Sequence, residues 1–136
     1  MLLKPPTCAS CVLYEKGKGF CPDKISRKHQ IVYWAEAPGK NEIAEGEPFK
    51  GKAGFVLHSW LTAAVPELRI AQERGEISFV NTLRCLPPEI QGRAYPRGEE
   101  RVLAEAHCRQ YDPPMDGVET VVLFGEAAQH LHFNVP

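Results

Sequence analysis

Four of the five cysteines have the number and spacing of metal ligands. Cys8 and Cys11 are separated by two residues, a spacing at which two thiolates can bind one metal centre. Cys85 and Cys108 follow much later, and we expect the fold to bring all four to one edge of the molecule. An odd number of cysteines argues against a closed set of disulfides. Four thiolates suit a [4Fe–4S] cluster or a structural Zn²⁺, and spacing alone does not choose between them.

The fifth cysteine, Cys21, lies in the same N-terminal segment as the first pair. We interpret it as a plain buried cysteine. The alternative is that it replaces one of the four ligands.

A segment rich in glycine and proline forms the second group of residues suited to chemistry. It holds two carboxylates, Glu36 and Glu42, and a lone aromatic residue, Phe49. Pro38-Gly39 breaks the chain after an apolar run, and later glycines allow another backbone or a ligand to approach closely. A strand, a loop of this kind and a helix are the usual layout of an α/β ligand site, which lies beyond the carboxyl ends of the strands.

A third candidate, Asn81, follows the apolar run 77–80. At the carboxyl end of a strand its amide can present one acceptor and two donors to a ligand. The alternative, a turn or cap residue, is favoured while Asn81 is considered alone.

The elements that must position these residues alternate along the chain. Apolar runs predict strands at 31–37, 77–80 and 118–124, and helical patterns occupy 54–65, 98–111 and the residues after 126. Residues 67–75 are a short helix or a turn, and 86–96 form a long loop. This order predicts an α/β fold with a parallel sheet, in which a cysteine-bearing leader (1–30) precedes the core (31–136) of a single domain.

Composition places the chain among globular proteins. It has 136 residues, 43% of them hydrophobic and 24% charged, with a net charge of −1. No apolar run approaches the roughly 20 residues of a membrane helix, and we see no signal peptide, so we expect a cytoplasmic protein without a membrane partner. Five Lys and Arg against one acidic residue between Lys16 and His29 form either a patch that faces phosphate groups or a solvated loop.

Taken together, these motifs resemble the family 4 uracil-DNA glycosylases, the iron–sulfur members of their superfamily. The resemblance runs from about Cys8 to about Gln129. It implies an α/β/α sandwich around a short parallel sheet, and a [4Fe–4S] cluster in preference to zinc. The residues that carry it are Cys8-x-x-Cys11, Glu36-Ala37-Pro38-Gly39-x-x-Glu42, Gly46-x-Pro48-Phe49-x-Gly51-x-Ala53-Gly54, Asn81-x-x-x-Cys85-x-Pro87-Pro88 and Cys108.

The resemblance also implies roles for single residues. The loop that begins at Glu36 and continues through Ala37, Pro38 and Gly39 would hold, with Glu42, the water that attacks the sugar C1′. Phe49 would stack on a uracil flipped out of DNA, and Asn81 would recognise its N3–H and O4 edge. The cluster would be bound by Cys8, Cys11, Cys85 and Cys108.

The sequence departs from the family pattern in three respects. Ala35 stands where a glycine is usual, and the segment between Cys85 and Cys108 is longer. Family members add a fourth strand and a His-Pro-Ser-type loop, and none of the five histidines here precedes a proline. We therefore expect a fold that is shortened at its C-terminal side, through truncation or degeneration, or completed by a protein partner on its open edge.

Two functions remain open at this point. The first is a DNA-repair enzyme that hydrolyses the N-glycosidic bond of uracil in single- or double-stranded DNA. The second is a non-catalytic iron–sulfur module of the same fold that binds DNA or a protein. Such a module could derive from a phage, since the superfamily includes domains associated with phage DNA polymerases.

Overall fold

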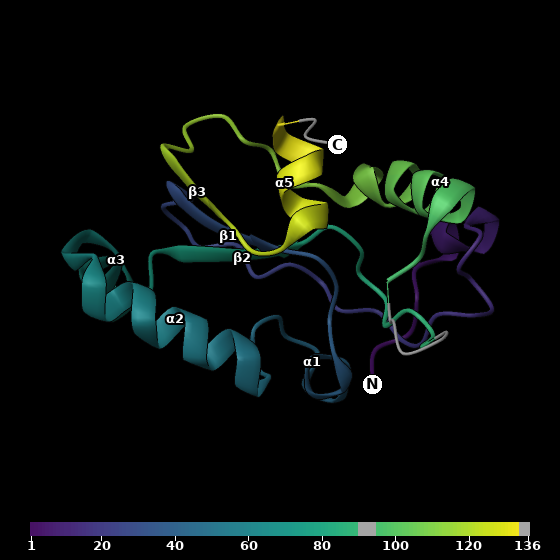
Figure 1. The fold of residues 1–136 in the computed structure, drawn as a ribbon, viewed down its shortest axis with the longest axis horizontal. Helices are drawn as coiled ribbons and strands as arrows, with labels where there is room; N and C mark the ends of the chain where they lie inside the picture. The colour runs from purple at the N-terminus through teal and green to yellow at the C-terminus, as the bar shows by residue number, and fades with distance from the viewer. Residues whose placement is uncertain (90–94, 134–136) are drawn as a thin grey trace.

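A three-stranded parallel sheet forms the centre of the computed structural model, which describes residues 1–89 and 95–133 (Figure 1). The strand order is β2-β1-β3, with β1 spanning Ile31–Ala35, β2 spanning Ile77–Asn81 and β3 spanning Thr120–Leu123. β1 pairs with β2 from Ile31↔Ile77 to Ala35↔Asn81. The carboxyl ends of the three strands therefore lie at the same edge of the sheet.

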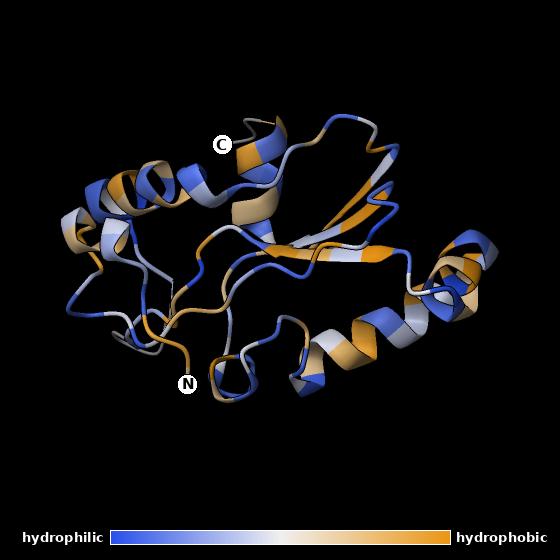
Figure 2. Cartoon of the chain, turned by 180° about the vertical axis from the view of Figure 1, so that it is seen from behind, coloured by the Kyte–Doolittle hydropathy of each residue, from blue (hydrophilic) through white to orange (hydrophobic). Residues whose placement is uncertain are grey.

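Helices cover both faces of this sheet. On one side lie α1 (Lys40–Glu45), α2 (Lys52–Ala64) and α3 (Pro66–Glu73) (Figure 1). On the other side α5 (Glu126–Phe133) lies over the sheet, and α4 (Gly98–Cys108) extends beyond its end (Figures 1 and 2). Two short 3₁₀ helices, Pro6–Ser10 and Arg109–Tyr111, flank α4. The predicted α/β/α arrangement is confirmed.

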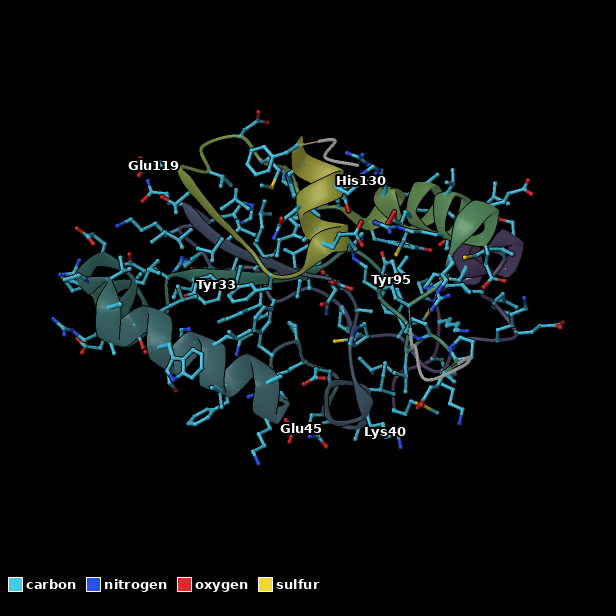
Figure 3. The ribbon with its side chains drawn as sticks, viewed as in Figure 1. Tyr33, Lys40, Glu45, Tyr95, Glu119 and His130 are labelled. Carbon is cyan, nitrogen blue, oxygen red and sulfur yellow. The ribbon has the colours of Figure 1, made fainter. Side chains whose placement is uncertain are left out.

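The central strand explains why both faces need a cover. Val32 and Trp34 are buried in a cluster with Ala128 of α5, whereas Tyr33 points to the opposite face and packs with Leu68 of α3. Figure 3 shows Tyr33 between the sheet and the layer of α2. Apolar side chains on both sides of a strand are typical of parallel sheets, because helices cover both faces.

The leader is more ordered than an irregular segment. It forms an antiparallel bridge to β2 at Lys24↔Phe79 and a second bridge to the segment after β2 at Lys18↔Leu86. The first bridge covers the outer edge of β2. Within residues 1–89 and 95–133 no strand pairs with the outer edge of β3.

The predicted order of elements is confirmed, with local corrections. β1 ends at Ala35 rather than at residue 37, and a six-residue helix, α1, occupies what the sequence predicted as loop. Residues 67–75 are largely helical, as α3. The predicted loop 86–96 lies in part outside the described residues.

The broad apolar face of α2 is not buried. Phe55, Leu57 and Trp60 are 69%, 40% and 68% exposed, and Thr62 is the buried residue of this helix. The physical reason is that another side of α2 faces the sheet. Leu61 packs on the cluster that contains Tyr33, and the His58 ring lies 5.2 Å from the Tyr33 ring. The helix also packs on α3.

No described helix is both long enough and apolar enough to cross a bilayer.

The turn between β3 and α5 generates a first prediction. Gly125 has φ +91°, and a Cβ atom placed on it would lie 2.1 Å from Glu36 Oε1. Gly117 has a similar φ of +82° but nothing within 4 Å of its Cβ position. We expect Gly117→Ala to lower the free energy of unfolding by about 1–2 kcal/mol, and Gly125→Ala to lower it by about 1–3 kcal/mol more.

Urea unfolding of the two variants measures the difference. Equal losses would contradict a tight contact between the Glu36 carboxylate and this turn.

Candidate functional site

A hollow of about 630 Å³ opens at the carboxyl ends of the strands. Strand β1 leads into it through Glu36 and Ala37, β2 contributes Asn81, and β3 leads to Phe124 and Gly125. Other predicted site residues line the same hollow, namely Gly39, Glu42 and Phe49. Pro38 lines a neighbouring hollow of about 500 Å³, which shares Glu36, Ala37 and Gly39 with the first. The structure thus brings together residues that are 45 positions apart, from Glu36 to Asn81.

Glu42 shapes the loop in which it was predicted to hold water. Its Oε1 accepts a hydrogen bond of 2.7 Å from the Gly39 N–H at the start of α1. A Cβ placed on Gly51 would lie 2.9 Å from the other oxygen, Oε2. The carboxylate therefore caps α1 and lies against the loop that precedes α2. The three-residue spacing from Gly39 to Glu42 is the signal in the sequence for this cap.

Phe49 is held in an unusual backbone conformation. Its φ is +59°, a left-handed value that is uncommon for an aromatic residue and typical of functional or strained positions. The ring packs on Phe79 and Phe124 with centroids 5.0 and 5.3 Å apart. A Cβ on Gly54 would lie 3.2 Å from the Phe49 ring, so a small residue is needed there. Phe49 is therefore a fixed aromatic surface in the wall of the hollow.

Asn81 is only 3% exposed although it lines the hollow. Its backbone N–H lies 3.4 Å from Asp23 Oδ1. Among the described residues its side-chain amide has no hydrogen-bond partner. An amide in the wall of the hollow can donate and accept hydrogen bonds toward a bound molecule.

Glu36 lies across the hollow from α2, against the turn at Gly125. Its backbone C=O accepts a hydrogen bond of 2.9 Å from the Leu83 N–H, which ties the segment after β1 to the segment after β2. The carboxylate is placed at the boundary of both hollows, beside the backbone of Ala37 and Gly39.

The four predicted cysteine ligands line one cavity at the far end of the molecule. Cys8 and Cys11 come from the leader, Cys85 from the segment after β2, and Cys108 from the last turn of α4. Cys21 is fully buried but does not line this cavity, and burial raises the pKa of its thiol to about 12. The structure thus separates the fifth cysteine from the other four.

The four cysteines around this cavity are a donor set that suits a [4Fe–4S] cluster or a Zn²⁺. Among residues 1–89 and 95–133 no three His, Cys, Asp or Glu side chains already lie in the arrangement that holds one metal ion. Burial raises the pKa of Cys85 to about 11 and also that of Cys108, so their thiolates need a nearby positive charge.

Hydrogen-bond donors surround these sulfur atoms. The Leu13 N–H donates to Cys11 Sγ at 3.4 Å, and the Tyr111 hydroxyl lies 3.3 Å from Cys8 Sγ. The Arg84 Nη1 donates to Cys108 Sγ at 3.7 Å. Donors of this kind stabilise thiolate ligands and tune the potential of a cluster.

Comparison with known proteins agrees with this geometry. The family model of the uracil DNA glycosylase superfamily matches residues 22–135. The chain belongs to this superfamily. Within it, the chain is 34% identical over 82 residues to a type-4 uracil-DNA glycosylase of Archaeoglobus fulgidus, a match that covers 60% of this chain and 38% of that protein.

Two further relatives give similar values. A type-4 uracil-DNA glycosylase of Saccharolobus solfataricus is 35% identical over 81 residues, which are 60% of this chain and 35% of that protein. One of Thermotoga maritima is 30% identical over 81 residues, which are 60% of this chain and 39% of that protein. The matches span less than two fifths of these curated relatives.

The sequence did not indicate that Arg84 is part of the site. Its side chain is 1% exposed and forms ion pairs of 3.0 Å with Asp23 Oδ2 and Asp112 Oδ1. It also donates to the Cys108 C=O at 3.0 Å and to the Thr82 C=O at 3.3 Å. Burial opposes its charge, but Asp23 outweighs that effect and holds the pKa of Arg84 above its usual value. We call these contacts the Arg84 network.

The Arg84 network generates the second prediction. Arg84→Met leaves the Asp23 carboxylate without an ion-pair partner among the described residues and leaves Asp112 with Arg109 alone, and we expect a loss of about 3–5 kcal/mol in the free energy of unfolding. The control is Lys16→Met, which removes the more exposed partner of Glu100 and should cost about 0–1 kcal/mol. Urea unfolding of both variants tests the difference, and a loss for Arg84→Met no larger than the control would refute it.

Proposed function

We propose that the chain is a uracil-DNA glycosylase, which hydrolyses the N-glycosidic bond of a uracil flipped out of DNA. One observation carries the proposal: the hollow at the strand ends places the Phe49 ring, the Asn81 amide and the Glu36–Glu42 loop around one space. An aromatic surface, a directional amide and a loop with carboxylates are the groups that base excision requires. The similarity to type-4 uracil-DNA glycosylases supports the same substrate.

Recognition of the base rests on two residues in this proposal. Phe49 stacks on one face of the uracil, because its ring is fixed by Phe79 and Phe124 and turned to the hollow. Asn81 donates to O4 and accepts from N3–H, since its amide has no other partner among the described residues. A site built to satisfy hydrogen bonds of one base leaves its own buried polar groups unpaired with another base.

The carboxylates act on the sugar side. Breaking the bond gives the sugar positive character, so a placed water and nearby negative charge are needed more than a strong nucleophile. Glu42 keeps the loop in shape through its bond to Gly39 N–H, and its second oxygen and Glu36 supply negative charge. The backbone of Ala37, Pro38 and Gly39 completes the wall that holds the water.

The departing base sets the main limit on the rate. Stabilisation of developing charge is usually a large term, and loss of one donor costs roughly 100- to 1000-fold. The sequence holds no His-Pro pair, which family 4 glycosylases use for this purpose. A second candidate is a non-catalytic iron–sulfur module that binds DNA with the same hollow, or a protein at the edge of β3, with which no strand pairs within residues 1–89 and 95–133.

We further propose that Cys8, Cys11, Cys85 and Cys108 bind a [4Fe–4S] cluster, with Zn²⁺ as the alternative. The cluster would supply a covalent link between the leader, the segment after β2 and the end of α4. The residues around it exclude water and direct donors at the sulfur atoms. Its role in this proposal is structural, because the cavity and the hollow that holds Phe49 share no lining residue.

The cluster assignment gives the third prediction. Cys85→Ala removes one of the four ligands, so we expect loss of the visible absorbance of the cluster and of its iron and sulfide content. Cys21→Ala is the matched control, since Cys21 is buried outside the cavity, and its spectrum should be unchanged. A colourless wild-type protein with one tightly bound zinc would overturn the assignment.

Excision tests the function itself. Cluster-loaded wild-type protein should release uracil from a single-stranded oligonucleotide, detected by alkaline cleavage at the abasic site. Asn81→Ala should lower kcat/KM for uracil by roughly 100-fold or more and remove the preference for uracil over thymine. Gln110→Ala, which removes an exposed amide bonded to the His107 C=O, serves as the control.

Unchanged base preference in Asn81→Ala would contradict the role of this amide. Binding of DNA without any excision by the wild-type protein would identify the non-catalytic module instead.

A further inference from the structure

We propose that the exposed face of α2 is a track for single-stranded DNA that leads away from the hollow. We define this α2 face by the exposed side chains of Ala53, Leu57, Trp60 and Ala64. The proposal rests on the proposed function, because it assigns a place to the nucleotides next to the base that enters the hollow.

The α2 face is large, apolar and uncovered. Trp60 and Leu57 are 68% and 40% exposed. Ala53, Leu57, Trp60 and Ala64 are exposed and follow one another at spacings of four, three and four residues, so they form one stripe along the helix. A patch of large apolar side chains on a surface marks an interaction site more often than chance.

The α2 face is continuous with the hollow. Ala53 and Leu57 belong to both, and Lys52 lines the hollow beside them. On the other side of Phe49 a smaller hollow of about 110 Å³ is lined by Phe55 together with Lys24 and Lys50. A strand whose base occupies the first hollow therefore meets α2 as soon as it leaves it.

Charge favours a polyanion on this track. Lys40 and Lys52 line the rim of the hollow and form no ion pair among the described residues. Figure 3 shows Lys40 on α1, on the same side of the sheet as α2. Lys24 and Lys50 are paired with Glu47 at 3.8 and 3.1 Å, whereas α2 itself carries no Asp or Glu. Two lysines that form no ion pair among the described residues therefore face a phosphate backbone at the rim, whereas the Glu36 and Glu42 carboxylates lie in the hollow itself.

Stacking selects single strands over duplex. The bases of a duplex already stack on one another, whereas unpaired bases can stack on exposed aromatic rings regardless of sequence. Lys52 and Trp60 are about 12 Å apart along the helix axis, which is room for roughly three stacked nucleotides at about 3.4 Å each. An apolar stripe with this spacing also suits a second copy of the chain, but a dimer would make no use of the lysines.

Tryptophan fluorescence tests the proposal directly. The chain has two tryptophans, of which Trp34 is 1% exposed and Trp60 is 68% exposed. We expect a short uracil-free oligothymidylate to quench the fluorescence of the full chain saturably, and a duplex of equal length to do so weakly. The quenching should disappear in Trp60→Phe, because only the buried Trp34 remains.

Affinities measured with a labelled oligothymidylate complete the test. Trp60→Ala should weaken binding by about 5- to 100-fold, the range for one stacked base, whereas Trp60→Phe should retain most of the affinity. Phe133→Ala is the matched control, since Phe133 is 70% exposed but belongs to α5 on the opposite layer, and it should bind as the wild type does. Lys52→Gln should reduce the slope of the logarithm of the binding constant against the logarithm of the salt concentration by about one, because one phosphate contact is lost.

Two results would overturn the proposal. One is wild-type affinity of Trp60→Ala for the oligothymidylate. The other is a change from dimer to monomer in Trp60→Ala without any change in affinity, which would make the α2 face an interface between copies of the chain. Because the oligothymidylate lacks uracil, the quenching experiment tests the α2 face alone. The excision experiment tests the glycosylase function, so the two proposals can fail independently.

Discussion

The buried guanidinium of Arg84 joins the leader, the segment after β2 and the end of α4. Its ion pairs reach Asp23 in the leader and Asp112 after α4, and its hydrogen bonds reach the backbone at Cys108. A planar group with five donors can satisfy such a set at once, which a lysine cannot do. Arg84 also directly precedes Cys85, so its network sets the positions of two of the proposed cluster ligands.

The same network extends toward the hollow. The Asp23 carboxylate binds Arg84 through both oxygens and lies near the Asn81 backbone N–H. The cavity that holds the cysteines and the hollow that holds Asn81 are thus separate spaces that share one supporting carboxylate. On the other side of the hollow, packing of aromatic rings replaces charge as the fixing interaction, because Phe49, Phe79 and Phe124 hold one another in place.

The sequence allowed prediction of what depends on local pattern. Three apolar runs and intervening helical patterns predicted the parallel sheet, and the spacing of Cys8 and Cys11 pointed to a ligand cavity that the structure also forms. Contacts between distant parts of the chain could not be predicted in this way. An arginine between Leu83 and Cys85 carries no sign that it pairs with two distant carboxylates in the interior, and the exposure of Trp60 depends on which side of α2 faces the sheet.

The leader determines at which edge another strand can add to this sheet. By pairing Lys24 with Phe79 it occupies the hydrogen-bonding groups that β2 would otherwise offer to another strand. β3 keeps its outer groups unpaired within the described part of the chain, so extension of the sheet is directional. Any segment that joins by β-augmentation adds next to Thr120–Leu123 and leaves the cysteine cavity undisturbed at the other end of the molecule.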